Sequence, residues 1–416
     1  MARRVGYAAG RLWAAKGVAP MDPLIWEWVS LLVRWLHVIA GIAWIGSSFY
    51  FIHLDASLKR HEGLPAGVSG EAWQVHGGGF YRMQKYGVAP AELPAELTWF
   101  KWEAYATWLS GFALLVVMYY LGAEIFLIDR GRLDLPVWAA IAISAGSLVL
   151  GWLAYDALCK SRLGLHDGRL AVILFVALVA AAWAYDQVFT GRAAYLHAGA
   201  LIGTMMVANV FFIIIPNQKV VVADLIAGRS PDPALGRQAK QRSLHNNYLT
   251  LPVVFTMISN HYPMTFASRW SWLIFAGVLL VGGLVRHFYN LRHAGRRPQW
   301  WLWPAATAVT VLLVTITLQR PGVVAEGEAA VSFAQIRPVL EQRCTVCHAA
   351  RPSFAGFQAP PGGVALETPE EIARQAELIH TQAVLTHAMP PGNLTGITDE
   401  ERRLLAAWHA AGAPLE

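Results

Sequence analysis

The chain has 416 residues, of which 56% are hydrophobic and only 14% are charged. This composition is much more apolar than that of an ordinary globular domain, which argues against a water-soluble enzyme and favours a bundle of membrane-spanning helices. The formal net charge of +6 comes from basic residues in the segments that connect the apolar runs, so no nucleic-acid partner is expected.

Residues 1–20 form a basic extension ahead of the first apolar run. The cationic side chains in it are Arg3, Arg4, Arg11 and Lys16. Because Met21-Asp22-Pro23 offers a natural start just before the apolar run, we interpret the extension as a mis-assigned start or a disordered tail.

Eight apolar runs lie between residues 21 and 320, and each is long enough to cross a hydrocarbon layer of ~30 Å. The weakest, at about 244–262, holds Pro252 and several polar residues. The other seven cover about 24–53, 102–128, 136–158, 169–189, 195–215, 270–290 and 299–318. The sequence therefore predicts an all-α protein in which residues 21–320 form an eight-helix transmembrane bundle in a lipid bilayer.

Basic residues are distributed unevenly between the two sets of connecting loops. The richer set holds Lys59, Arg60, Arg82, Lys85, Lys101, Lys160, Arg162, Arg169, Lys219, Arg229, Arg237, Lys240, Arg242, Arg292, Arg296 and Arg297. The poorer set holds Arg130, Arg132, Arg192 and Arg269. The positive-inside rule places the richer set in the cytoplasm of a bacterium and both chain ends on the outer side of the inner membrane.

A weak internal repeat divides the apolar region into two halves. His37 and Phe51 recur, at the same spacing, as His197 and Phe211. Such a repeat indicates a tandem of two four-helix units related by an axis along the membrane normal, with the two histidines at equal depth.

Polar side chains inside apolar runs are costly and are therefore functional candidates. His37 could ligate a non-covalent b-type haem, together with His197, or exchange a proton, or bond a neighbouring carbonyl; the sequence leaves these roles open. The strings His245-Asn246-Asn247-Tyr248 and Ser259-Asn260-His261 bracket the weakest run with donors and acceptors that suit a small planar heterocycle.

The sequence Cys344-Thr345-Val346-Cys347-His348 is the C-x-x-C-H motif of covalent c-type haem attachment. Cys344 and Cys347 would form the thioethers, and His348 would ligate the iron. Met389, 41 residues further on, is the expected sixth ligand. A Met/His axial pair raises the potential of the iron, which makes the haem an electron acceptor.

The surroundings of the motif favour haem over zinc. A zinc site needs a second ligand pair, and the other cysteine, Cys159, lies in a distant apolar run. Helices are predicted from Phe333 to Arg343 and, after a capping sequence at Thr398, through Trp408. Residues 331–416 are therefore predicted to form a periplasmic, class I-like cytochrome c domain, joined to the bundle by a linker at 321–330.

Four stretches carry a resemblance to a known family: 34–51, 245–252, 259–263 and 389–393. Together with eight spans fused to a cytochrome c, they resemble the bacterial membrane-bound urate oxidase family, also called urate hydroxylase or PuuD. The likeness extends from Met21 onward, and the basic extension departs from it. The resemblance implies oxidation of urate to 5-hydroxyisourate in purine degradation, with electrons leaving through the cytochrome.

Urate is a planar anion, so the site needs cationic or amide groups and a base near the attacking water. The expected substrate-binding residues are Arg34, Lys101, Asn246, Asn247 and Asn260. The expected bases are His37, Glu103, His245 and His261. The electrons would pass to the single haem c and then to a downstream respiratory acceptor.

Two other readings compete with a urate oxidase. A membrane cytochrome that carries electrons from quinol to a periplasmic acceptor would also use the bundle histidines, but it would not need the surplus of asparagines. A transporter with a fused redox sensor is disfavoured because the apolar runs lack paired glycine-interrupted helices.

Overall fold

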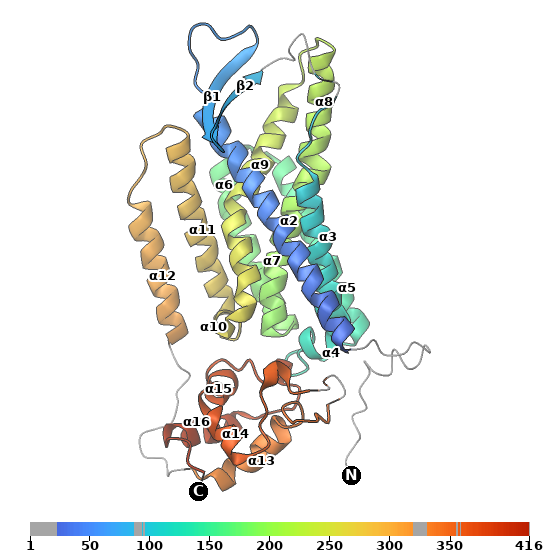
Figure 1. Cartoon of the computed structure of the whole chain (residues 1–416), viewed down its shortest axis with the longest axis vertical. Helices are drawn as coiled ribbons and strands as arrows, with labels where there is room; N and C mark the ends of the chain where they lie inside the picture. The colour runs from blue at the N-terminus through green and yellow to red at the C-terminus, as the bar shows by residue number, and fades with distance from the viewer. Residues whose placement is uncertain are drawn as a thin grey trace.

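The computed structural model describes residues 23–86, 94, 96–318, 331–354, 357 and 359–415. The expected basic extension at 1–20 and the expected linker at 321–330 lie outside the described residues. Figure 1 shows long helices side by side, with a two-stranded hairpin at one end of the bundle and a small helical domain from the C-terminal part of the chain at the other.

Each of the eight predicted apolar runs contains a helix. The bundle consists of α2 (Pro23–Ser57), α3 (Trp102–Leu115), the π-helical turn η1 (Val116–Tyr120), α4 (Ala123–Phe126), α5 (Val137–Lys160), the 3-10 turn η2 (Arg162–Leu165), α6 (Asp167–Val188), α7 (Gly191–Ala208), the π-helical turn η3 (Asn209–Ile214), α8 (Ile215–Ile226), α9 (Pro233–Ile258), the 3-10 turn η4 (Ser259–His261), α10 (Pro263–Phe266), α11 (Ser271–His293) and α12 (Leu302–Leu318).

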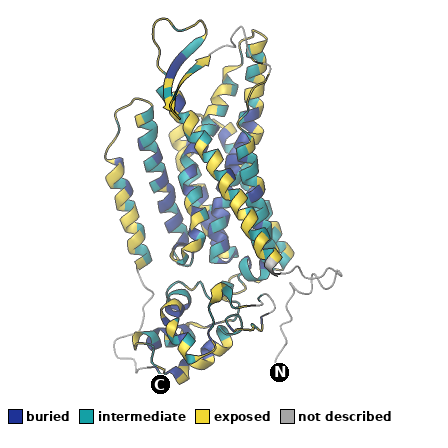
Figure 2. Ribbon diagram, in the orientation of Figure 1, coloured by how far each residue is buried: buried dark blue, intermediate teal, exposed yellow. Residues whose placement is uncertain are grey.

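Five helical stretches of the described chain are long and apolar enough to cross a membrane: Ile25–Ser57, Val137–Lys160, Asp167–Val188, Gly191–Ile226 and Ser271–His293. Figure 2 shows many exposed positions along α2 and α12, and large apolar residues are among them. Trp35 and Ile42 of α2 are 65% and 63% exposed, which suits lipid better than water. The chain therefore has the helices of a membrane protein.

The weakest predicted span differs most from expectation. The run at 244–262 covers the second half of α9 and the turn η4, and α9 begins well before it, at Pro233, where the Asp232 side chain caps it. Pro252 lies inside this helix, where α11 approaches closely: a Cβ added at Gly282 would lie 2.7 Å from Pro252 Cδ. Small residues at such crossings let two helix backbones pack tightly.

A β-hairpin between α2 and α3 corrects the all-α prediction. Strand β1 (Val68–His76) pairs antiparallel with β2 (Gly79–Tyr86) around a turn at Gly77 and Gly78, whose φ angles are +58° and +77°. Two consecutive positive φ angles are the requirement of a tight type I′ hairpin turn, which glycine meets without strain. The glycine pair was the local turn signal that the all-α prediction did not use.

The C-terminal domain is helical, as predicted. It contains α13 (Phe333–Arg343), the 3-10 turn η5 (Pro361–Gly363), α14 (Pro369–Arg374), α15 (Ala376–Ile379), the π-helical turn η6 (His380–Leu385), the 3-10 turn η7 (Pro391–Asn393) and α16 (Asp399–Ala410). Ile336 and Leu340 of α13 pack with Leu405 and Trp408 of α16 in its core. The two predicted helices are confirmed, and Thr398 forms the expected capping box at the start of α16.

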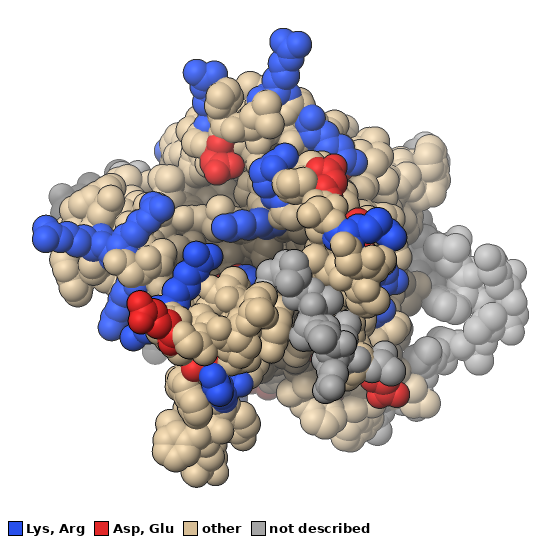
Figure 3. Space-filling view, turned by 90° about the horizontal axis from the view of Figure 1, so that it is seen from above, with Lys and Arg blue, Asp and Glu red and all other residues tan. Residues whose placement is uncertain are grey.

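The bundle is basic at the end that carries the hairpin. Viewed from that end, the surface shows many more Lys and Arg than Asp and Glu (Figure 3). The C-terminal domain lies at the opposite end (Figure 1). Arg242, which the sequence assigned to the basic loops, lies inside α9 and is only 2% exposed, with its guanidinium paired within the bundle.

Candidate functional site

The C-x-x-C-H motif follows α13 directly. The His348 Nδ1 donates a hydrogen bond to the Val364 carbonyl at 2.8 Å. This bond fixes the tautomer that leaves Nε2 with its lone pair, the arrangement that metal-ligating histidines require. Cys344 and Cys347 are free thiols, and burial raises the pKa of Cys344 to about 12. The motif therefore offers two unlinked thiols and one oriented imidazole, which fit a c-type haem.

The loop of Met389 is held by both of its backbone groups. Its N–H donates to the Gln382 carbonyl of η6 at 2.9 Å, and its carbonyl accepts a hydrogen bond from Arg402 of α16 at 3.0 Å. Arg402 also donates to the Ala383 carbonyl, which ties α16 to η6. The backbone of the expected sixth ligand is thus fixed by two neighbouring elements.

The Met389 loop also contacts the bundle. Gly392 of η7 faces the Ile128 carbonyl and the methyl group of Thr190, at the N-terminus of α7. Thr190 is itself fixed, since its hydroxyl donates to the Phe126 carbonyl at 2.6 Å. The expected sixth-ligand loop therefore rests on the end of the helix that carries His197.

His197 is fully buried and has both ring nitrogens engaged. Its Nδ1 donates to the Ala193 carbonyl at 2.7 Å, so Nε2 accepts the hydrogen bond from the Ser144 hydroxyl at 2.6 Å. The Tyr120 hydroxyl lies 2.8 Å from Ser144 Oγ and continues this series of hydrogen bonds. A b-type haem at His197 would have to displace Ser144, so these contacts favour a hydrogen-bonding role.

His37 lies at a different level of the bundle. Its Nδ1 donates to the Thr107 carbonyl at 2.9 Å, halfway along α3, whereas the ring of His197 lies beside Tyr119 in η1. His37 Nδ1 also lies 3.1 Å from the Ser110 hydroxyl, so the two rings contact different turns of the segment formed by α3 and η1. The prediction of equal depth for the two histidines is therefore wrong.

A buried polar network joins α5, η3 and α9. Arg242 Nη2 lies 2.7 Å from Asp156 Oδ1, and Arg242 Nη1 donates to Asn209 Oδ1 at 3.2 Å. Asn209 in turn donates to Asn246 Oδ1 at 3.0 Å, and His245 Nδ1 shares a 2.7 Å hydrogen bond with the Tyr155 hydroxyl. The expected site residues His245 and Asn246 are therefore brought together, but the cation beside them already has a carboxylate partner.

A second network, between α9 and α11, contains a cation without such a partner. Arg286 is 6% exposed, and its Nε donates to Asn247 Oδ1 at 3.3 Å. Its guanidinium carbon lies 4.0 Å from the centre of the Phe49 ring of α2. Asn290 also donates to Asn247 Oδ1, at 2.9 Å. Within the described chain, no carboxylate pairs with Arg286, and the buried Asn247 Nδ2 has no hydrogen-bond partner.

Among the described residues, Arg286 donates only to the amide oxygens of Asn247 and Asn290, at 3.3 and 3.4 Å, and the Asn247 Nδ2 has no described acceptor, so both groups suit an anionic ligand. Burying an unpaired charge costs several kcal/mol, which protein structures normally offset with an opposite charge. The flat ring of Phe49 and the amide groups of Asn247 and Asn290 would suit a planar anion with polar edges. Of the described clusters, this one has the chemistry expected for the predicted heterocycle site.

The remaining predicted residues lie elsewhere. Arg34 is exposed and donates to the Met118 sulfur at 3.3 Å, while Lys101 stacks over the Trp102 ring at 5.3 Å. Asn260 accepts from Arg192 at 3.3 Å near the other end of the bundle, and His261 is exposed. Glu103 lies in the first turn of α3. No described contact joins these five residues to Asn247 or to Asn246.

Comparison with protein-family models gives one match, to the urate oxidase N-terminal model, over residues 23–318. This range covers more than two thirds of the chain. The chain belongs to the urate oxidase N-terminal family. The resemblance read from the sequence is confirmed for the bundle, and family membership gives the chain a urate-related oxidoreductase function at the coarse level. Searches of curated proteins and of solved structures return no match.

The urate oxidase match includes both buried networks and ends before the haem motif. The networks at Arg242 and at Arg286 both lie within residues 23–318, whereas Cys344 and Met389 lie beyond it. Membership in the family therefore concerns the bundle, and haem binding by the C-terminal domain rests on the motif and on its geometry.

Three residues of the Arg286 network were not predicted as urate-site residues. Arg286 lies within the predicted run at 270–290, and Phe49 lies in a stretch that resembles the urate oxidase family, but the sequence did not connect them with Asn290. A usable signal existed: Arg286 and Asn290 are four residues apart and so share one face of a helix. Their proximity to Asn247 depends on the packing of α9 against α11.

Proposed function

We propose that this protein is a membrane urate oxidase that converts urate to 5-hydroxyisourate in purine degradation and delivers the electrons to its own c-type haem. The single observation that carries the proposal is the buried, carboxylate-free guanidinium of Arg286 within a urate oxidase family bundle. Family membership supports urate as the substrate, and the Arg286 network supplies the group that an anionic purine needs.

In this proposal Arg286 pairs with the urate anion. Its guanidinium donates to Asn247 Oδ1 and lies over the Phe49 ring, so it is already oriented before urate binds. The unpartnered Nδ2 of Asn247 would donate to a ring nitrogen or carbonyl oxygen of urate. A charge-assisted bond of this kind contributes about 1.5–3 kcal/mol to binding.

The reaction needs a base as well as an anion site. The urate anion and one water give neutral 5-hydroxyisourate, one proton and two electrons, so one proton must leave the site. Tyr248 and His287, next to Asn247 and Arg286 in sequence, share a 2.8 Å hydrogen bond between the Tyr248 hydroxyl and His287 Nδ1. We assign proton removal to this pair, because it lies on the same two helices as the anion site.

The charge distribution supports entry of urate from the hairpin end. Arg286 lies in the last third of α11, toward the end where basic side chains gather (Figure 3). A basic surface raises the local concentration of an anion and speeds its association. By the positive-inside rule this end faces the cytoplasm, and the C-terminal domain then lies in the periplasm of an inner-membrane protein.

The haem residues in this proposal are Cys344, Cys347, His348 and Met389. A c-type haem bound there supplies a one-electron acceptor of raised potential, which a downstream respiratory acceptor re-oxidises. The chain itself positions this domain by seating Gly392 against Ile128 and Thr190. A b-type haem is not assigned to His37 or His197, because they lie at different depths and His197 Nε2 already accepts from Ser144.

Urate turnover by membranes that contain the protein tests the proposal. Loss of urate absorbance and formation of 5-hydroxyisourate should both be seen, without hydrogen peroxide. Membranes that contain Arg286→Met protein at equal haem content should show much slower turnover. Turnover of quinol but not of urate would favour the electron-conduit reading instead.

A further inference from the structure

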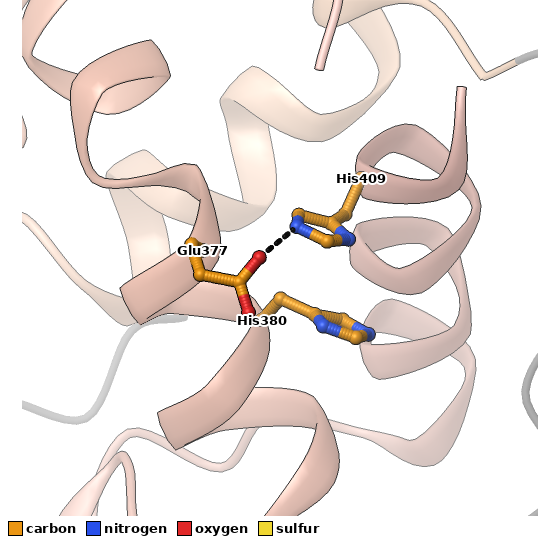
Figure 4. Close-up of side chains that lie close together, drawn as sticks. All are labelled: Glu377, His380 and His409. Atoms are coloured by element: carbon orange, nitrogen blue, oxygen red, sulfur yellow. Dashed lines mark hydrogen bonds and ion pairs between the residues drawn. The ribbon is translucent and has the colours of Figure 1, made fainter. Parts of the chain in front are cut away.

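Glu377, His380 and His409 lie together in the C-terminal domain, away from the haem motif in sequence. Glu377 belongs to α15, His380 begins η6, and His409 lies near the end of α16. One ligand atom from each residue can be chosen so that all three lie within 4.8 Å of one another. Figure 4 shows the carboxylate and the two imidazoles converging from the two neighbouring segments.

We propose that these three residues form a binding site for a divalent transition metal ion, with Zn²⁺ as its simplest probe. Two imidazoles and one carboxylate are a ligand set that zinc accepts, with a fourth position open to water. The class of ion follows from the donors, because imidazole nitrogen suits zinc, copper and nickel, whereas calcium and magnesium take oxygen ligands.

The ring geometry brings the donors close to convergence. The imidazoles of His380 and His409 are stacked with centroids 4.1 Å apart and planes 5° from parallel. His409 Nε2 lies 2.9 Å from Glu377 Oε2. Because parallel rings do not aim their lone pairs at one point, metal binding requires a tilt of one ring, and the partly exposed His409 is free to make it.

The site is buried on the side of His380 and open to solvent on the side of Glu377. His380 is 6% exposed, whereas Glu377 is exposed at the surface. An ion would therefore enter from solvent on the carboxylate side and meet the buried imidazole last. Glu377 and His380 are three residues apart, so one turn of chain supplies two ligands, and α16 supplies the third.

A metal ion here would brace the backbone that holds Met389. The ion would join η6 to α16, and these two elements supply the Met389 contacts: the Gln382 carbonyl and the Arg402 guanidinium. Stapling the two segments together should therefore stabilise the Met389 loop. This role does not depend on urate, so the metal proposal and the proposed function can fail separately.

Zinc titration of the full-length holoprotein tests the site. The protein is purified in detergent with a tag free of histidine, treated with a chelator and titrated with ZnCl₂ by calorimetry. We expect one tight Zn²⁺ per chain. Glu377→Gln and His409→Ala should each weaken binding at least about tenfold, since even residues that only support a metal ligand cost that much. His76→Ala, which removes an exposed imidazole of the hairpin, should leave binding unchanged.

Two further readouts keep the test decisive. Zn²⁺ should raise the unfolding temperature of the wild-type C-terminal domain and fail to do so in both site variants, whose haem spectra should stay native. Electron paramagnetic resonance of bound Cu²⁺ should show two coordinated nitrogens in wild type and fewer in His409→Ala. Absence of tight binding by wild type, or equal binding by wild type and both variants, would overturn the proposal.

Discussion

Gly392 packs directly against Thr190, and this contact joins the Met389 loop to the helix of His197. A Cβ added at Gly392 would lie 3.1 Å from Thr190 Cγ2 and 2.9 Å from the Ile128 carbonyl oxygen. Gly392 also has a φ of +53°, in the left-handed region that side chains disfavour. The loop can approach the bundle this closely only because the residue is glycine.

Gly392→Val should slow electron transfer from the bundle to the haem. The added side chain must push the Met389 loop away from Thr190, while the haem ligands stay within their own domain. Rapid mixing with urate should show slower haem reduction with an unchanged haem spectrum. Gly396→Val is the matched control: Gly396 also has a positive φ, of +68°, but it faces only Arg343. Equal slowing in both variants would show that backbone strain, and not docking, is responsible.

Arg286→Met should weaken urate binding without unfolding the bundle. Loss of a charge-assisted bond worth about 1.5–3 kcal/mol raises the apparent KM roughly 10- to 150-fold. Stability should hold or rise, because the variant removes a buried cation that has no described carboxylate partner. The control is Arg269→Met, which removes an exposed arginine stacked on Trp270. An unchanged KM would place the urate site elsewhere.

Arg242→Met should have the opposite phenotype. It leaves the Asp156 carboxylate buried with only Lys160 beside it, so we expect a loss of up to about 3–5 kcal/mol of stability. The double variant Arg242→Met with Asp156→Leu should recover most of this loss. Thermal unfolding in detergent measures both. If the single variant were as stable as wild type, the pair would not be the structural element described above.

Met389→Ala should lower the haem potential and slow turnover. Replacing a thioether ligand removes the contact that raises the potential of a His-ligated iron. Potentiometric titration of the haem bands measures the shift, while urate affinity should change little. Unchanged potential would mean that the sixth ligand is another residue, such as His380 or His387.

Low pH should loosen the hairpin through Glu71. Hydrogen bonds from Gln84, Arg82 and Trp73 lower its pKa from 4.5 to about 2. The folded pKa lies below the ordinary value, so the contribution of Glu71 is fully present above about pH 4.5 and is lost as the pH falls toward 2. Hydrogen exchange across residues 68–86, corrected for the intrinsic rate, should rise over that window. Glu71→Gln should exchange faster at neutral pH and show a flatter response.

Sequence patterns predicted the helices well because their signals are local. Apolar length marked a helix in each of the eight predicted runs, and the capping sequence at Thr398 marked the start of α16. The hairpin was not predicted because the all-α prediction rested on the apolar composition of the chain, although Gly77-Gly78 carries a local turn signal. The start of α9 was missed because its first half is polar and buries Arg242 through a partner, Asp156, eighty-six residues away.

The candidate site was only partly predictable because its contacts join residues that are far apart in the sequence. Asn247 could be named from its polar string, but whether a nearby cation is free or paired depends on contacts between helices. Arg242 and Arg286 look alike in sequence, and only packing shows that one faces a carboxylate and the other faces Phe49. Relative depth is equally non-local, which is why His37 and His197 were wrongly placed at one level.

Anaerobic reduction of the haem by urate tests whether the bundle oxidises urate and passes the electrons to the C-terminal domain. The oxidised, purified protein is mixed with urate or, separately, with a ubiquinol analogue, and the haem absorbance bands are followed. Urate should reduce the haem rapidly in wild type and in Arg269→Met, and slowly in Arg286→Met. Failure of urate to reduce the wild-type haem, alongside rapid reduction by the quinol, would show that the protein is a quinol-linked electron conduit and not a urate oxidase.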